Sequence, residues 1–280
     1  MKILLAKSAG FCFGVKRAIN MAYEATEKHE HLCSLGPIIH SPQVVEKLRE
    51  KGVRDVESLE EGTEGAVIVR SHGVTAQELR KARSFELEIV DATCPFVKKA
   101  QEHAASLNRE GYAVVLVGEE EHPEVQGILS YAEGGGEVFV VADRKQAEGL
   151  PRKKRLGVVA QTTQSLDNLR QVVEVCLEKS QELRVFNTIC DATALRQDEA
   201  QAIARQVEVM LVLGGYNSAN TNRLAEICLN IQPRTHHVET AAEIDPDWFH
   251  GVESVGITAG ASTPLWIIDE VLEKVRFRGK

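Results

Sequence analysis

The sequence predicts an α/β protein made of three pseudo-threefold-related α/β units, arranged as a cloverleaf around one shared centre. Short β-branched runs alternate with amphipathic segments of ten residues or more, as in proteins whose sheets are largely parallel. Three cysteines, Cys12, Cys94 and Cys190, each end a short apolar stretch and are followed at once by a helix-like run. A polar residue then follows each cysteine at the same distance, which indicates an internal repeat.

The strands and helices can be placed along the chain from their hydrophobic periodicity. Buried strands are expected where valine, isoleucine and leucine form short runs, at residues 66–70, 112–118, 156–161, 207–215 and 254–260. Helices are expected where apolar residues recur every three or four positions, at residues 14–29, 41–51, 75–84, 95–110, 165–180, 192–206, 219–230 and 262–275.

The repeat also predicts where the units begin and end. The strand before Cys94 is expected to pair within the first unit, and the strand before Cys190 within the second. By the same logic, the N-terminal strand completes the third unit. The predicted units are residues 13–93, residues 94–189, and residues 190–280 completed by residues 1–12.

Two loops recur in each unit. His40 follows Cys12 by 28 residues, His122 follows Cys94 by 28, and Ser218 follows Cys190 by 28. The second loop comes after a strand and carries a hydroxyl residue that is expected to cap the next helix, at Thr75, Ser165 and Ser262. Because ligands of α/β proteins gather where strands end and helices begin, these loops are expected to face one central cavity.

The three repeated cysteines are candidate metal ligands. A thiol at a helix N-terminus has a lowered pKa and favours the thiolate that binds metals. Zinc or an iron–sulfur cluster would suit three thiolates, but the short cysteine spacing typical of structural zinc sites is absent. In a cubane cluster, three ligands leave one iron open for chemistry. The remaining cysteines, Cys33, Cys176 and Cys228, lie in apolar patterns and are expected in the core.

Polar residues in the repeated loops suggest an anion site. His40, His72 and His122 follow strands, and the third unit offers Ser218 and Asn220 in the corresponding place. Imidazoles, hydroxyls and amides near helix N-termini can cradle a diphosphate. Thr162 and Ser262 fit either this role or helix capping.

Glu124 is the one carboxylate of these loops placed to face the centre. A carboxyl group near a cluster and a diphosphate should have a raised pKa, which makes Glu124 a candidate proton donor. A glutamate in the first turn of a helix also stabilises the helix dipole, and this plainer role stays open from the sequence.

The composition narrows the class of protein. The chain has 280 residues and a net charge of −8, which argues against nonspecific nucleic-acid binding. It has no run of eighteen apolar residues and no signal-peptide pattern at its start, so we expect a cytoplasmic protein without a membrane partner. The six cysteines do not form the pattern of a disulfide framework.

Eight ordered motifs between residue 10 and about residue 264 resemble the 4-hydroxy-3-methylbut-2-enyl diphosphate reductase family, whose enzymes complete the methylerythritol phosphate route to isoprenoids. One departure is Ala219, where many relatives carry a second serine. The motifs are AGFCFGVKRAI, SHGV, DATCP, HPEV, QTTQS, the cysteine of NTICDAT, GGYNSANTNRL and GITAGASTP.

This resemblance implies reductive dehydroxylation of an allylic diphosphate to isopentenyl and dimethylallyl diphosphate. It implies a 4Fe–4S cluster with one open iron, ligated by Cys12, Cys94 and Cys190. It implies proton delivery through Glu124 and Thr162, and an electron donor such as a ferredoxin or flavodoxin. It places the diphosphate among His40, His72, His122, Thr162, Ser218, Asn220 and Ser262.

Other classes of function fit parts of the pattern. A zinc-dependent hydrolase would use cysteine or histidine ligands, with Glu124 activating water. A non-catalytic iron–sulfur redox sensor would use the three cysteines and would have no need for the anion donors. A phosphate-binding module with purely structural thiols would hold no metal. Metal content and binding of an allylic diphosphate separate these alternatives.

Overall fold

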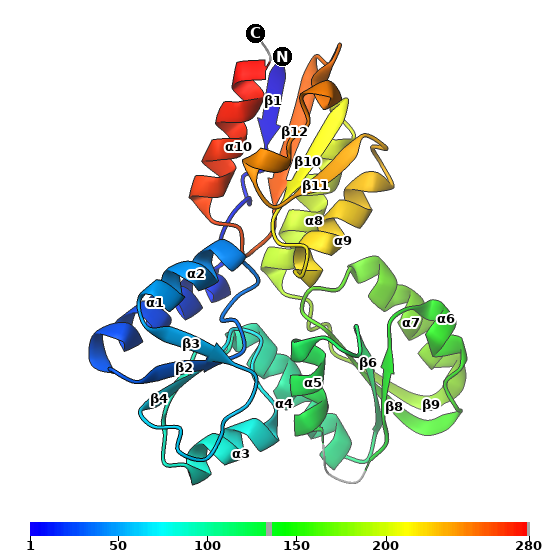
Figure 1. Cartoon of the computed structure of the whole chain (residues 1–280). Coiled ribbons are helices and arrows are strands. Elements are labelled where there is room, and N and C mark those ends of the chain that lie inside the picture. The colour runs from blue at the N-terminus through cyan, green and yellow to red at the C-terminus, as the bar shows by residue number, and fades with distance from the viewer. Residues whose placement is uncertain (133–135, 279–280) are drawn as a thin grey trace. The chain divides into compact units, whose positions relative to one another are not determined.

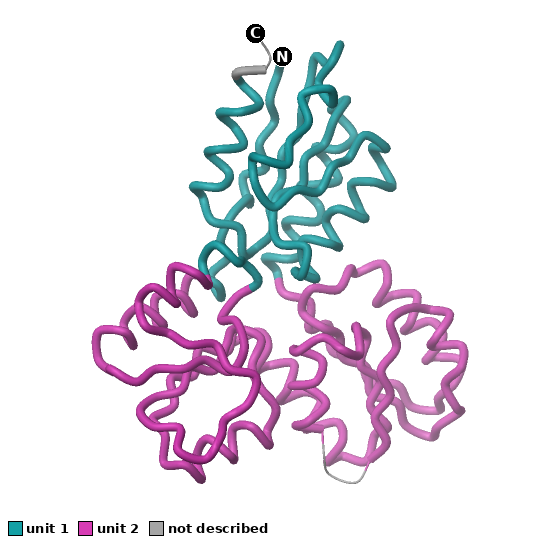
Figure 2. The backbone as a smooth tube through the Cα atoms, in the orientation of Figure 1, with its two compact units in different colours: residues 1–15, 40–44, 191–280 teal, residues 16–39, 45–190 magenta. Residues whose placement is uncertain are grey.

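The computed structural model describes residues 1–132 and 136–278 and divides the chain into two compact units (Figure 2). The first unit comprises residues 1–15, 40–44 and 191–280, and the second comprises residues 16–39 and 45–190. None of the described helices is both long and apolar enough to cross a membrane. The three-domain boundaries expected from the sequence remain a prediction.

The first unit contains one four-stranded sheet in which every described pairing is parallel. β1, at the N-terminus, lies beside β12, near the C-terminus (Figure 1), which is the pairing expected for the N-terminal strand. The strands in spatial order are β1 (Lys2–Leu5), β12 (Ser254–Ala259), β10 (Val209–Leu213) and β11 (Thr235–Val238).

Helices cover both faces of this sheet. One face packs on α8 (Asp191–Ala204) and α9 (Ala219–Leu229), and the other packs on α10 (Leu265–Arg278). Two short 3₁₀ helices, η1 (Ala241–Glu243) and η2 (Pro246–Phe249), follow β11. The central strands β10 and β12 are almost entirely buried because both of their faces are covered, whereas the edge strands β1 and β11 are partly exposed.

The second unit contains two further four-stranded parallel sheets. The strands of the first are, in spatial order, β3 (Val53–Val56), β2 (Leu32–Leu35), β4 (Ala66–Val69) and β5 (Glu88–Asp91). Those of the second are β7 (Val138–Val141), β6 (Ala113–Val117), β8 (Lys153–Ala160) and β9 (Ser180–Val185). The strands before Cys94 and Cys190, β5 and β9, pair with β4 and β8, as expected.

The helices of the second unit follow the strands in alternation. They are α3 (Ala76–Ser84), α4 (Pro95–Arg109), α5 (Pro123–Tyr131), α6 (Arg144–Glu148) and α7 (Leu166–Lys179). Two more helices, α1 (Phe13–Lys28) and α2 (Pro42–Glu50), contribute residues to both units.

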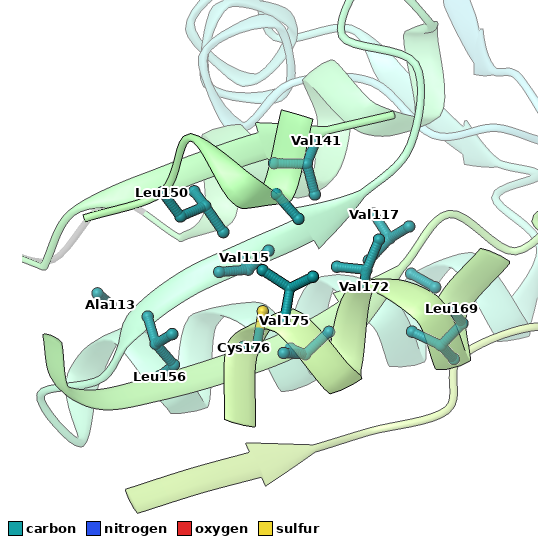
Figure 3. Close-up of a cluster of buried hydrophobic side chains, with 13 residues drawn as sticks. Ala113, Val115, Val117, Val141, Leu150, Leu156, Leu169, Val172, Val175 and Cys176 are labelled. Carbon is teal, nitrogen blue, oxygen red and sulfur yellow. The ribbon is translucent and has the colours of Figure 1, made fainter. Parts of the chain in front are cut away.

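Apolar side chains fill the space between each sheet and its helices. Figure 3 shows one such core, where valines of β6 meet α7 and Cys176 lies among them. Val115 and Val172 are fully buried there. Burying a side chain of this size stabilises the folded protein by about 1.5–3 kcal/mol. The packed layers therefore hold in place the strand ends that lead into the polar loops.

Candidate functional site

The three repeated cysteines occupy the same local position. Cys12 directly precedes α1, Cys94 is the N-cap residue of α4, and Cys190 directly precedes α8. All three side chains are partly exposed. A residue at this position lies beside the backbone N–H groups of the first helical turn, which lack helical partners.

The backbone of each cysteine is held by the second repeated loop of the sequence. The N–H groups of Cys12, Cys94 and Cys190 donate to the carbonyl oxygens of Ala261 (3.1 Å), Ser71 (2.9 Å) and Thr162 (3.1 Å). The bond from Cys12 lies within the first unit, and the other two lie within the second. The repeat seen in the spacing is therefore also a repeat of hydrogen bonding.

The other cysteines are core residues, as expected. Cys33, Cys176 and Cys228 are buried. Burial raises the pKa of the Cys176 thiol to about 11 and that of Cys228 to about 12, and it also raises the pKa of Cys33. Neutral thiols in apolar surroundings are poor metal ligands.

The side chain of Glu124 is buried, and its carboxylate is bonded to Thr162. Its carboxylate accepts hydrogen bonds from the backbone N–H of Thr162 (2.6 Å) and from the Thr162 hydroxyl (2.9 Å). Burial raises the pKa of Glu124 to about 7, although both hydrogen bonds act in the opposite direction. Because the carbonyl of Thr162 also holds Cys190, this threonine joins the carboxyl group to a cysteine-bearing loop.

His122 and His72 lie beside each other in the same unit. Their rings meet edge to face, with centroids 5.5 Å apart. His122 is the N-cap residue of α5, and its Nδ1 accepts a hydrogen bond from the backbone N–H of Glu124 (3.1 Å). Nδ1 is therefore unprotonated, which leaves Nε2 as the ring nitrogen that donates.

The helix α5 was not among the helices expected from periodicity, although the alternative role left open for Glu124 placed this residue in the first turn of a helix. Glu124 lies in the first turn of this helix. Its carboxylate is nevertheless engaged by Thr162, so stabilising the helix dipole is not its only role.

The remaining polar candidates lie in the first unit. The Ser262 hydroxyl donates to the carbonyl oxygen of His40 (2.9 Å). Ser218 is the N-cap residue of α9 and accepts from the backbone N–H of Thr221 (3.3 Å). Asn220 is only 6% exposed, yet neither atom of its amide has a hydrogen-bond partner among residues 1–132 and 136–278.

The capping expected for Ser262 is wrong. Thr75 and Ser165 cap α3 and α7 as expected, each accepting from a backbone N–H three residues ahead. The helix α10, however, begins at Leu265, and the Ser262 hydroxyl turns to the carbonyl of His40 instead. Pro264 directly precedes this helix, and its carbonyl oxygen accepts a hydrogen bond from the backbone N–H of Ile268 (3.4 Å).

Two glycines determine how closely the loops of the first unit pack. Neither was among the candidate residues predicted from the sequence. A Cβ at Gly260 would lie 2.1 Å from the hydroxyl oxygen of Thr221, and one at Gly214 would lie 2.6 Å from that of Thr263. Gly214 also has a φ of +140°, which few other residues adopt. Both glycines occur in motifs quoted above, GGYNSANTNRL and GITAGASTP, and this was their only signal in the sequence.

The candidate residues divide between the two units. Within the second unit the structure brings together His72, His122, Glu124 and Thr162, and bonds Cys94 and Cys190 to the loops that carry them. Within the first it brings together Cys12, His40, Ser218, Asn220 and Ser262 on neighbouring loops. Neither unit, over its described residues, by itself gathers three His, Cys, Asp or Glu side chains able to hold a metal ion.

Comparison with known proteins assigns this chain to a family. The family model described as LytB protein matches residues 3–276. The chain belongs to the LytB family. This family is the one expected from the motifs, and the match covers all the candidate residues.

Relatives of this LytB chain bear one enzyme name. A protein of Syntrophotalea carbinolica named 4-hydroxy-3-methylbut-2-enyl diphosphate reductase is 66% identical over 275 residues, which is 98% of each chain. A protein of Geobacter metallireducens with the same name is 63% identical over 276 residues, 99% of this chain and 97% of the relative.

Two solved structures extend the likeness to three dimensions. The structure of (E)-4-hydroxy-3-methyl-but-2-enyl diphosphate reductase, described as the terminal enzyme of the non-mevalonate pathway, is 44% identical, with a TM-score of 0.71 and coverage of 99% of this chain and 100% of that one. The Plasmodium falciparum reductase is 27% identical, with a TM-score of 0.89 and coverage of 99% and 87%. The predicted fold class, α/β with three repeated units, is confirmed.

Proposed function

We infer that this LytB-family chain is an oxidoreductase, a 4-hydroxy-3-methylbut-2-enyl diphosphate reductase. The reaction breaks the allylic C–O bond of the substrate, takes up two electrons and two protons, and releases water with isopentenyl or dimethylallyl diphosphate. The observation that carries this proposal is identity above 60% over nearly the whole length to relatives of that name. The hydrolase and redox-sensor alternatives have no comparable support.

The thiols of Cys12, Cys94 and Cys190 fit an iron–sulfur cluster by their chemistry. Each is partly exposed at the start of a helix, and each has its backbone N–H fixed by an equivalent loop. We propose that they hold one 4Fe–4S cluster and leave one iron without a protein ligand. When bound, the cluster would supply electrons and a Lewis-acidic iron for loss of the hydroxyl group.

Glu124 and Thr162 are proposed to deliver the proton. A carboxyl group with a pKa of about 7 is protonated in a large fraction of molecules at neutral pH. Its oxygen lies 2.9 Å from the Thr162 hydroxyl, so a proton can pass from the carboxyl group to the threonine and on toward the leaving hydroxyl group. Burial of Glu124 keeps bulk water away from this proton.

The diphosphate is proposed to bind through neutral donors and helix N-termini. The supporting observation is Asn220, whose buried amide lacks a partner in the described chain and lies in the first turn of α9. Ser218, at the N-cap, and Ser262 offer hydroxyl groups on adjacent loops. His40, His72, His122 and Thr162 complete the proposed set, and His122 offers Nε2 as a donor.

The electron donor is proposed to be a small carrier such as a ferredoxin or flavodoxin, because two single electrons are needed per turnover. The cytoplasmic location expected from the sequence also stays a proposal.

The test is conversion of the allylic diphosphate by protein purified without oxygen and supplied with a reduced dye. The expected products are isopentenyl and dimethylallyl diphosphate, identified by mass spectrometry. Release of inorganic phosphate or diphosphate without reduction would instead identify a hydrolase. Binding of the substrate without any turnover would contradict the assigned activity.

A further inference from the structure

The loop between β1 and α1, residues 6–12, carries Cys12. It is hydrogen-bonded to α8, which lies about 190 residues further along the chain. The carboxylate of Glu199 accepts three hydrogen bonds from this loop. The donors are the backbone N–H of Lys7 (2.7 Å), the backbone N–H of Ser8 (2.9 Å) and the Ser8 hydroxyl (2.5 Å).

A second side chain of α8 holds the same loop closer to the cysteine. Arg196 is only 4% exposed, and its guanidinium donates to the carbonyl oxygen of Gly10 (2.7 Å). The same guanidinium donates to the carbonyl of Ala192 in its own helix (2.9 Å), which fixes its direction. Gly10 has a φ of +102°, a conformation that favours glycine, so Arg196 bonds the residue at which the loop takes this unusual conformation.

These contacts determine how the loop approaches Cys12. Beyond Gly10 the backbone N–H of Cys12 bonds Ala261, and the Cys12 sulfur accepts from the backbone N–H of Val15 (3.4 Å). Every residue of these contacts belongs to the first unit. Hydrogen bonds to charged groups are stronger than hydrogen bonds between neutral groups. Glu199 and Arg196 therefore contribute most to holding this loop in place.

We propose that Glu199 and Arg196 are positioning residues that hold Cys12 in the geometry needed to ligate the cluster. Neither side chain is expected to touch the cluster or the substrate. The inference rests on the proposed role of Cys12 as a cluster ligand. It adds that α8, the helix that follows Cys190, holds the loop that carries Cys12. A cysteine on a loosened loop should lose its metal more readily and react more freely.

The experiment compares Glu199→Ala with Glu208→Ala. Glu208 is a matched control because its carboxylate also accepts two backbone N–H groups and one serine hydroxyl, those of Glu253 and Ser254. Those bonds lie where β12 begins, whereas Cys12 bonds Ala261, just beyond the strand's other end. Both variants lose the same kind of contact, but only one loses it near Cys12.

Two measurements are made on the full-length protein. The first is the rate at which a chelator removes iron from the cluster-loaded protein. The second is the alkylation rate of Cys12 in cluster-free protein, read by peptide mass spectrometry with Cys94 and Cys190 as internal references. For Glu199→Ala we expect both rates to rise roughly tenfold, the equivalent of one charge-assisted hydrogen bond, with Glu208→Ala near the wild type.

Glu199→Gln provides a milder variant in case the alanine variant does not fold. Its amide oxygen can still accept from the loop, so both rates should lie between those of the wild type and Glu199→Ala. The proposal is overturned if the Glu199 variants match Glu208→Ala in both measurements. If wild-type protein binds no iron, the proposed function fails, and the alkylation rates still decide whether α8 positions Cys12.

Discussion

At the scale of single residues, Glu124 is a carboxyl group with almost no access to water. It is 1% exposed and bonded twice to Thr162, and its pKa is raised to about 7 by burial. Desolvation disfavours the carboxylate more than the two hydrogen bonds favour it. The result is a carboxyl group that can both hold and release a proton near neutral pH.

Glu124→Gln is expected to retain the cluster and lose turnover. The amide keeps the size of the side chain but has no acidic proton, and loss of a general acid lowers kcat by about 10² to 10⁴. In the wild type, kcat should decline as the pH rises through about 7, because the protonated form is then lost. Steady-state rates and iron content across pH check both points. Near-normal activity in the variant would remove Glu124 from the mechanism.

The same residue should make folding stability depend on pH. The folded-state pKa of about 7 lies above the ordinary value of 4.5, so the stability that Glu124 contributes is fully present below about pH 4.5 and is lost as the pH rises through 7. Glu124→Gln cannot ionise, and its melting temperature should vary less between about pH 5 and 8. Calorimetry of the cluster-free proteins measures this. Parallel profiles for variant and wild type would show that Glu124 keeps an ordinary pKa.

The six cysteines should separate into two classes on substitution. Cys94→Ser removes a proposed ligand and is expected to abolish the open-iron cluster, whereas Cys176→Ala removes a core thiol with a pKa of about 11 and should keep the full iron content. Iron analysis after reconstitution measures both. The three-cysteine cluster is wrong if Cys94→Ser binds iron as the wild type does.

The sequence singled out the candidate cysteines but not the residues that hold their loops. Equal spacing identified Cys12, Cys94 and Cys190, because a repeat leaves a periodic signal. It did not reveal that Thr162 bonds Glu124 or that Glu199 bonds Ser8, since such pairs depend on side-chain directions across loops that meet only in the fold.

At the scale of elements, the site residues gather where helices begin. Cys94, His122 and Ser218 are each the N-cap residue of a helix. Backbone N–H groups in the first turn lack helical partners, so such positions suit an anion and a thiolate. The alternation of strands and helices makes this possible, since each parallel strand leads directly into a loop and a helix.

Asn220→Ala is expected to weaken binding of inorganic diphosphate roughly tenfold, the effect of losing one hydrogen bond to a charged group. Asn230→Ala is the matched control, because Asn230 lies at the opposite end of the same helix, as the C-cap residue of α9. Titration calorimetry measures both affinities. Equal losses in the two variants would exclude a direct role for Asn220.

Helices and strands with strong hydrophobic periodicity were predicted well, whereas several short elements were not predicted. The expected helix at 95–110 is α4, residues Pro95–Arg109, and the strand at 112–118 is β6, Ala113–Val117. The helix α5 has only nine residues, with apolar side chains spread around it, and β3, β7 and β11 have four residues each. Length alone does not explain this, because the helices α2 and α3 also have nine residues and were expected. In α5 the apolar residues do not gather on one side, so the segment lacks the helical period that distinguishes a helix from a loop.

At the scale of the whole molecule, the three repeated cysteines are distributed over both compact units. Cys12 belongs to the first, and Cys94 and Cys190 belong to the second. The repeat predicted three α/β units, and the described residues form three four-stranded parallel sheets. The exact boundaries of the units stay a prediction.

The most direct test of the account is the metal and sulfide content of protein purified without oxygen, with its electron paramagnetic resonance spectrum recorded before and after adding the allylic diphosphate. We predict about four irons and four acid-labile sulfides per chain, with a spectrum that the substrate changes. Zinc without sulfide, or no metal after reconstitution, would contradict the reductase and return the three cysteines to a zinc site or to structural roles.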